Sequence, residues 1–134
     1  MGINERLKEL GLNLPDCPAP AFSYKRVKRV GNLAFVSGHI NLFNGKLSLE
    51  GKLGREITVI QGREVAKEAT MNCLTALNSE LGGLDKVKQI VKLTGYVSSA
   101  EGFNDQPLVI DAASELLMKI FEGEAGEHAR AALG

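Results

Sequence analysis

Apolar and polar residues alternate along two short segments in the first third of the chain. Residues 24–30 alternate apolar and basic side chains, and residues 33–40 are mostly apolar. The Gly-Asn pair at 31–32 and the Asn-Gly pair at 44–45 are typical of two-residue hairpin turns. These patterns predict an antiparallel meander with strands over 24–30, 33–40 and 46–53.

The spacing of apolar residues changes in the middle of the chain, where they recur every three or four residues. This spacing predicts an amphipathic helix over 58–81 that ends at the Gly-Gly pair 82–83. Its apolar face is predicted to consist of Val65, Ala69, Cys73, Ala76, Leu77 and Leu81. A second helix is expected over about 107–121, with Asp105 as N-cap and Pro107 in its first turn. Its buried face is predicted to consist of Val109, Ala113, Leu116, Leu117 and Ile120.

Residues 87–98, between the two helices, return to the alternating pattern of a strand. One face of this strand is predicted to hold Val91, Leu93, Gly95 and Val97, and the other Lys92, Thr94 and Tyr96. A short helix over 3–11 and an irregular, proline-rich connector over 14–20 are expected before the first strand. No strand pattern follows the second helix, because the closing residues 128–134 (HARAALG) have good helix propensity. The order of elements predicts a single α+β domain over 1–134, with an antiparallel-rich sheet and both long helices packed on one face.

The composition argues against several classes of partner. Of the 134 residues, 16 are basic and 16 are acidic, so no net charge attracts nucleic acid or anionic lipid. No apolar run approaches the roughly 18 residues that span a bilayer, and the N-terminal segment lacks the apolar core of a secretion signal. We therefore expect a cytoplasmic protein with no nucleic-acid or membrane partner. The two cysteines, Cys17 and Cys73, can pair, but the helical position of Cys73 favours a buried free thiol.

Several catalytic and cofactor motifs are missing from the sequence. It contains neither of the glycine-rich motifs that cradle phosphates. His39 and His128 lack the spacing of a metal site, so we expect neither metal nor cofactor. Ser37 and His39 are two residues apart on a predicted strand and point the same way, but no nucleophile elbow surrounds Ser37. The simpler interpretation is that Ser37 and Gly38 form a kink at the end of the strand.

Four segments of the chain resemble the motifs of a known protein family. They are VGNLAFVSGHI at 30–40, GREITVIQGREVAKEATMNCLTAL at 54–77, DKVKQIVKLTGYVSS at 85–99 and HARAALG at 128–134. Taken in this order, they resemble the reactive intermediate deaminase (Rid) family, also called the YjgF family. The resemblance covers most of the chain, from about residue 18 to the last residue.

The resemblance implies a fold, an assembly and an activity. The family fold is like that of the trimeric bacterial chorismate mutases, with a curved sheet, two helices on one face and active clefts between the subunits of a homotrimer. Family members hydrolyse reactive enamines and imines, such as 2-aminoacrylate and 2-iminopropionate, to a 2-oxo acid and ammonia without a cofactor. The expected partners are therefore a small carboxylate substrate and two further copies of this chain.

The resemblance also assigns roles to particular residues. Arg130 matches the arginine that binds the substrate carboxylate, a role suited to the two parallel donors of a guanidinium. Ser37 and Gly38 match the family's Ser-Gly pair, and Tyr24 stands where the family has a tyrosine that closes the pocket. Two interpretations stay open beside these roles: Arg130 as a solvated residue at a helix end, and Tyr24 as a packing residue.

The chain departs from the family pattern at several positions. Asp111 stands in place of an asparagine, His39 in place of a glutamine, and His128 in place of a proline. Asp111 and His39 are expected to line the substrate site, and His39 can also act as a base, because its ordinary pKa is near 6.5. The family's next strand, with its glutamate, has no counterpart here, so we expect that the natural chain extends further.

These departures leave three functions to compare. Enamine or imine hydrolysis is the leading hypothesis, and a non-catalytic trimer that binds small carboxylate metabolites is the alternative. Ribonuclease activity, also attached to the family, is disfavoured by the neutral charge. The alternating residues Val91, Leu93 and Val97 are predicted to form the sheet face that the trimer buries.

Overall fold

The computed structural model describes residues 2–16, 18–20 and 22–134, and in these residues it confirms the predicted turns. Strand β1 (Val27–Val30) pairs antiparallel with β2 (Leu33–Val36), and β3 (Leu42–Phe43) pairs antiparallel with β4 (Lys46–Leu47). Positive φ angles occur in both turns, 57° at Gly31, 51° at Asn44 and 78° at Gly45. Glycine and asparagine tolerate this left-handed conformation, which explains their place between the strands.

The three strands of the meander are shorter than the sequence predicts. Residues 37–40 and 48–53 lie outside regular strands. Beyond β2, one further backbone bond joins Ser37 N–H to the carbonyl of Arg26, over 2.8 Å. After that point, side chains bond the backbone carbonyls: the Ser37 hydroxyl bonds the carbonyl of Lys25, and the His39 ring bonds the carbonyl of Ser37. The backbone ladder does not continue. Leu53, predicted as the end of the third strand, makes only isolated bridges to Ile57 and Ser99.

All three predicted helices are present. Helix α1 covers Ile3–Glu9, α2 covers Val59–Leu81 and α3 covers Gln106–Ile120. A capping box of Thr58 and Gln61 begins α2, and Gly82, with a φ of 75°, ends it. Asp105 occupies the N-cap position of α3, but its side chain makes no capping hydrogen bond, so the predicted side-chain cap is wrong.

The buried face of α2 is rotated relative to the prediction. Ala76 and Leu77 are buried as predicted. Val65, Ala69 and Cys73 are only half-buried, whereas Met71 and Leu74 are buried. The rotation arises because α2 packs against α3 on one side and against β1 and β2 on another. The predicted face of α3 is confirmed, since all five of its residues are buried: Val109, Ala113, Leu116, Leu117 and Ile120.

The closing segment of the chain is a strand, which corrects the expectation that no strand follows the second helix. Strand β6 (Ala129–Leu133) pairs in parallel with β5 (Lys92–Tyr96), in a register that sets Leu93 opposite Arg130. Two 3₁₀ turns, η1 (Leu84–Lys86) and η2 (Gly123–Gly126), precede these strands. The local preference of alanine, leucine and arginine for helix is overridden by the ladder that β5 offers.

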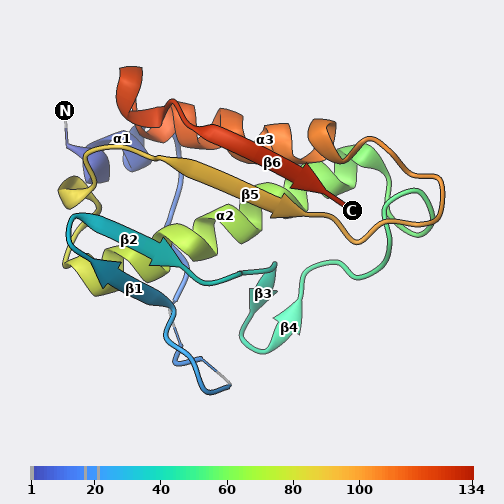
Figure 1. Ribbon diagram of the computed structural model, residues 1–134, viewed down its shortest axis with the longest axis horizontal. Helices are drawn as coiled ribbons and strands as arrows, with labels where there is room; N and C mark the ends of the chain where they lie inside the picture. The colour runs from blue at the N-terminus through green and yellow to red at the C-terminus, as the bar shows by residue number, and fades with distance from the viewer. Residues whose placement is uncertain (1, 17, 21) are drawn as a thin grey trace.

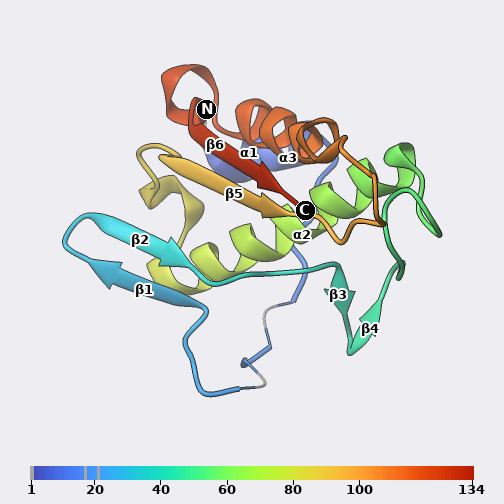
Figure 2. The same ribbon diagram turned by 45° about the vertical axis from the view of Figure 1, so that its right-hand side comes forward.

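The described chain has two layers, with the helices on one side of the strands (Figures 1 and 2). The three strand pairs form the other layer. Side chains between the layers form the core, whose most buried large members are Phe121, Leu74, Leu84 and Ile120. Gly95 of β5 lies directly against the side chain of Ile110 in α3, so the two elements approach closely. The α+β fold class is confirmed, with two antiparallel strand pairs and one parallel pair.

The strand layer leaves large apolar side chains exposed on its other side. Successive residues of a strand point to opposite faces, and Val27 and Val97 point to the helices. The opposite face, called here the open sheet face, carries Val30, Leu33, Phe35, Tyr96 and Leu133, each at least 49% exposed. The sequence assigned this role to Val91, Leu93 and Val97. Val97 is buried and Leu93 packs into the core, so the assignment is wrong for these two, whereas Val91 is 56% exposed. Among the described helices, none combines the length and apolarity needed to cross a bilayer.

Candidate functional site

Arg130 lies on β6 and turns its side chain toward α3. Its Nη1 lies 2.9 Å from Oδ1 of Asp111 and 3.3 Å from Oγ of Ser114. The side chain of Arg130 is 26% exposed and that of Asp111 is 47% exposed, so the ion pair lies at the surface. The structure thus brings together two of the residues that the sequence proposed, through the packing of β6 on α3.

A series of hydrogen bonds connects Arg130 through Ser114 to His128 and the backbone of Gly126. Ser114 Oγ lies 2.9 Å from Nε2 of His128, and the other ring nitrogen, Nδ1, lies 2.7 Å from the carbonyl oxygen of Gly126. A carbonyl only accepts, so Nδ1 of His128 carries a proton, and in the neutral ring Nε2 accepts from the Ser114 hydroxyl. The Ser114 oxygen is then left to accept from Arg130. The series assigns every donor and acceptor one direction and fixes the orientation of the guanidinium.

We call Asp111, Ser114, His128 and Arg130 the arginine cluster. Ser114 was not singled out from the sequence, although one signal was present. It is a polar residue among the apolar residues of the buried face of α3, and it is only 6% exposed. A buried hydroxyl needs a hydrogen-bond partner, so its position predicts a polar neighbour.

The guanidinium of Arg130 keeps one edge available. Both described hydrogen bonds use Nη1, and Nε and Nη2 have no partner among the residues that the structure describes. These two nitrogens form the edge that binds a carboxylate through two parallel bonds. The arginine cluster can therefore hold an anionic group without first breaking its own contacts.

A second group of candidate residues lies just beyond the end of β2. His39 Nδ1 donates to the carbonyl of Ser37 over 2.7 Å, and Nε2 accepts from Nη1 of Arg26 over 2.9 Å. Burial lowers the pKa of His39 below its ordinary value of 6.5, the bond to the Ser37 carbonyl opposes this, and the charge of Arg26 lowers it further. We call Tyr24, Arg26, Ser37, Gly38 and His39 the hairpin-end group.

The hairpin-end group does not contain an activated serine. The hydroxyl of Ser37 donates to the carbonyl of Lys25, 2.5 Å away, and both nitrogens of His39 are bonded elsewhere. Gly38 has nothing within 4 Å of the position that a Cβ would take, so its backbone is open to a ligand or a neighbouring chain. Tyr24 is 49% exposed. It lines an open groove of about 460 Å³ together with Pro18, Ala19, Pro20, Lys25, Arg26, Val27, Ala76, Ser79 and Glu80.

Within one chain the two groups are separate. No hydrogen bond between described residues joins the arginine cluster to Tyr24, Ser37 or His39. Both views show β5 between β6 and the β1–β2 hairpin (Figures 1 and 2). The structure therefore brings Arg130 to Asp111, and His39 to Ser37, but it does not bring these two pairs together in a single chain.

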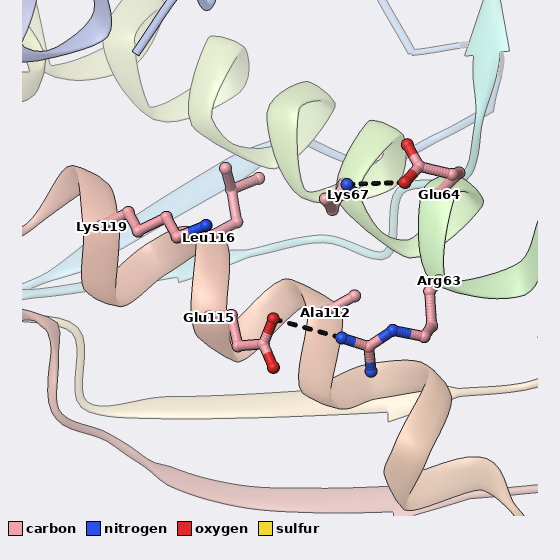
Figure 3. Close-up of a pocket in the computed structure, with 7 residues that line it drawn as sticks. All are labelled: Arg63, Glu64, Lys67, Ala112, Glu115, Leu116 and Lys119. Atoms are coloured by element: carbon pink, nitrogen blue, oxygen red, sulfur yellow. Dashed lines mark hydrogen bonds and ion pairs between the residues drawn. The ribbon is translucent and has the colours of Figure 1, made fainter. Parts of the chain in front are cut away.

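A small hollow between α2 and α3 contains no predicted site residue (Figure 3). Its volume is about 80 Å³, and charged side chains of both helices line it. Arg63 pairs with Glu115 over 3.2 Å, and Lys67 pairs with Glu64 over 2.7 Å. The first of these ion pairs links the helices, so we interpret the hollow as part of their packing.

The remaining candidate chemistries are a metal site and a reactive cysteine thiol. Among them, no three His, Cys, Asp or Glu side chains gather closely enough to hold a metal ion. Burial raises the pKa of the Cys73 thiol to about 11, so the thiol is protonated at neutral pH and is a poor nucleophile. Cys17, the other half of the disulfide considered above, lies outside the described residues.

The structure defines an α+β protein in which an arginine of a strand, Arg130, pairs with Asp111 of the helix packed against that strand. Comparison with known proteins agrees with this class. The family model described as "YjgF/chorismate mutase-like, putative endoribonuclease" matches residues 4–133. The chain therefore belongs to the YjgF/chorismate mutase-like family, and the resemblance found in the sequence is confirmed.

Relatives of known structure or sequence support the assignment. Protein TCP17 of Trypanosoma cruzi is 35% identical over 132 residues, which cover 98% of this chain and 82% of that protein. The crystal structure of Atu1372 from Agrobacterium tumefaciens, a protein of unknown function, superposes with a TM-score of 0.88 at 38% identity, over 98% of this chain and 80% of that one. A Shewanella oneidensis protein that bears the same endoribonuclease description superposes with a TM-score of 0.93 at 34% identity, over 99% and 87% of the two chains.

Proposed function

We propose that this protein hydrolyses small imines and enamines that carry a carboxylate, giving a 2-oxo acid and ammonia. One observation carries the proposal: no described residue bonds the Nε–Nη2 edge of Arg130, while Asp111 and Ser114 both bond Nη1. A pre-oriented guanidinium binds a carboxylate with two charge-assisted bonds and loses little conformational freedom in doing so. Membership of the YjgF family supports this choice of substrate class.

The proposed reaction needs positioning more than a strong nucleophile. Water adds its oxygen to the carbon of the C=N bond, the nitrogen takes up a proton, and the resulting aminoalcohol collapses to C=O as ammonia leaves. An enamine must first move a proton from nitrogen to carbon and so become the imine. Arg130 would fix the carboxylate and thereby the position of the reacting carbon. Backbone groups at Gly38 and the hydroxyl of Tyr24 are the proposed contacts for water and the nitrogen.

We propose further that the site forms between subunits of a homotrimer. The hairpin-end group and the arginine cluster each present open surface, at Gly38 in one case and at the Arg130 edge in the other. A neighbouring chain that covers the open sheet face would bring one group to the other. The large exposed apolar side chains of that face support an assembly.

The test is turnover of 2-aminoacrylate, generated in the assay by a dehydratase, with Arg130 changed. We expect Arg130→Ala to lose about ten- to a hundredfold in kcat/KM, the equivalent of one charged hydrogen-bonded contact. Arg130→Lys should recover little, because an ammonium does not offer two parallel donors. The matched control is Arg63→Ala, which removes an arginine of equal side-chain exposure, 26%, from an ion pair with Glu115. Wild-type rates in Arg130→Ala would rule out the carboxylate clamp.

A non-catalytic trimer that binds small carboxylates is the second candidate. Asp111 favours it, because a carboxylate beside Arg130 replaces the neutral amide that the family resemblance leads one to expect. The two functions differ in one measurement. A binder would take up small carboxylate metabolites through Arg130 without accelerating loss of 2-aminoacrylate, whereas a hydrolase would do both.

Ribonuclease activity, the description carried by the family model and by the Shewanella protein, is less well supported here. The 16 basic residues are balanced by 16 acidic ones, and the proposed arginine is paired with Asp111. A polyanion such as RNA binds mainly through unpaired basic side chains along the protein surface that it contacts. Incubation with single-stranded RNA provides the contrasting assay, and we expect no cleavage.

A further inference from the structure

We propose that Asp111 makes the site selective for a substrate that carries a positive nitrogen next to its carboxylate, and that it works against the anionic 2-oxo acid product. This inference deepens the proposed function and rests on it. It names the protonated imine, an iminium carboxylate, as the form of substrate that the arginine cluster accepts.

The geometry supplies one binding surface of each sign. Arg130 offers its Nε–Nη2 edge, and Asp111 lies on the other side of the guanidinium with Oδ1 at 2.9 Å from Nη1. The second oxygen of Asp111, Oδ2, has no hydrogen-bond partner among the described residues, and the side chain is 47% exposed. A small ligand on the arginine edge would therefore lie across the guanidinium from a carboxylate whose charge still acts on it.

Charge decides which ligand fits such a surface. The pair of Arg130 and Asp111 has no net charge, so a simple anion gains from the guanidinium but is repelled by the aspartate. An iminium carboxylate or an amino acid presents both signs, and its nitrogen is attracted by the charge of Asp111 while its carboxylate lies on Arg130. The same aspartate would stabilise the protonated C=N bond, which is the form that water attacks more readily.

The product lacks the positive charge through which Asp111 is proposed to recognise the substrate. Hydrolysis replaces the positively charged nitrogen by a neutral carbonyl oxygen and leaves the carboxylate unchanged. The 2-oxo acid is thus a pure anion beside Asp111 and should dissociate more easily than the substrate. A neutral asparagine at this position would not distinguish the two by charge.

The experiment compares two probes with the same carbon skeleton, L-alanine and pyruvate. Their dissociation constants are measured by NMR titration at pH 7 on the intact assembly. Wild type should bind L-alanine more tightly than pyruvate. Asp111→Asn should shift the ratio of the two constants about tenfold toward pyruvate, the effect of removing one nearby, partly exposed charge. Asp111→Ala, which removes the charge without adding an amide, should shift it in the same direction.

The matched control lies on the same helix. Glu115→Gln removes the same charge from α3, and the Arg63–Glu115 pair is 26% and 53% exposed, close to the 26% and 47% of the Arg130–Asp111 pair. The control should leave the ratio at its wild-type value. The proposal is overturned if Asp111→Asn behaves like Glu115→Gln, or if wild type prefers pyruvate. If the protein shows this charge selectivity but does not hydrolyse 2-iminopropionate, the proposed hydrolase function is rejected and the proposed selectivity stands.

Discussion

His39 shows how its surroundings set the charge of a single residue. Burial comes first and the charge of Arg26 adds to it, and together they lower the pKa below 6.5 although the Ser37 carbonyl acts in the opposite direction. The histidine is thus neutral in the folded protein at pH 7, with the proton on Nδ1. A neutral ring suits a hydrogen-bonding role beside Arg26 better than the role of a charged acid.

This shift makes stability depend on pH. Above pH 6.5 the histidine is neutral in both the folded and the unfolded chain, so it has no effect. As the pH falls below that value, the unfolded chain takes up the proton first, so the free energy of unfolding decreases until the folded pKa is passed. His39→Gln should show a smaller decrease between pH 7 and 5 in urea unfolding. His128 is present in both proteins, so equal pH dependence in the two would contradict the prediction.

The sequence supplied the residue types of the site but not their contacts. Arg130, Asp111 and Ser37 were identified by resemblance, since their neighbours in the sequence resemble the family's motifs. The ion pair of Arg130 with Asp111 was not predicted, because it depends on how β6 packs on α3. The position of Ser114 between Arg130 and His128 has the same origin. Contacts between elements depend on tertiary packing, which cannot be predicted from the pattern of residues within one element.

At the scale of elements, local signals predicted most of what forms locally. The hairpin turns, the end of α2 at Gly82 and the face of α3 depend on neighbours within a few residues, and the structure confirms the turns and both long helices. Strand β6 was missed for the opposite reason. Its partner β5 is distant in sequence, and its own residues prefer a helix when taken alone.

The close approach of β5 and α3 gives a prediction for Gly95. A Cβ at this position would overlap the side chain of Ile110, which is buried and has little room to move. Gly95→Ala should therefore lower the free energy of unfolding by about 1–3 kcal/mol, as overpacked cores do. Urea denaturation measures the change, and Gly38→Ala is the control, because nothing lies within 4 Å of its Cβ position. Equal losses in the two variants would show that space at Gly95 is not the cause.

At the scale of the whole molecule, the strand layer is covered on one side only. The open sheet face collects five large apolar residues, and single chains in solution rarely leave such a surface uncovered. The proposed trimer would bury it and would also bring the hairpin-end group to the arginine cluster of a neighbour. Assembly and function would then depend on the same surface.

A charge on this face should separate the subunits. Phe35 is 59% exposed in the single chain, and burying a glutamate in its place would cost far more than the interface gains there. Light scattering at micromolar concentration should give a trimer for wild type and a monomer for Phe35→Glu. Ile60→Glu is the control, since Ile60 is 78% exposed at the start of α2 in the other layer. A monomeric wild type would exclude the trimer and the shared site.

The parallel pairing of β5 and β6 has a consequence for the order of folding. Parallel strands cannot be joined by a tight turn, so the chain crosses from one to the other through α3. Strand β6 has no ladder to join until β5 and α3 are in place, and contacts between distant segments form slowly. We therefore expect Arg130 to reach its native position only after β5 and α3 have formed. A molecule that has opened only at β6 would keep its helical core and lose its anion-binding residue.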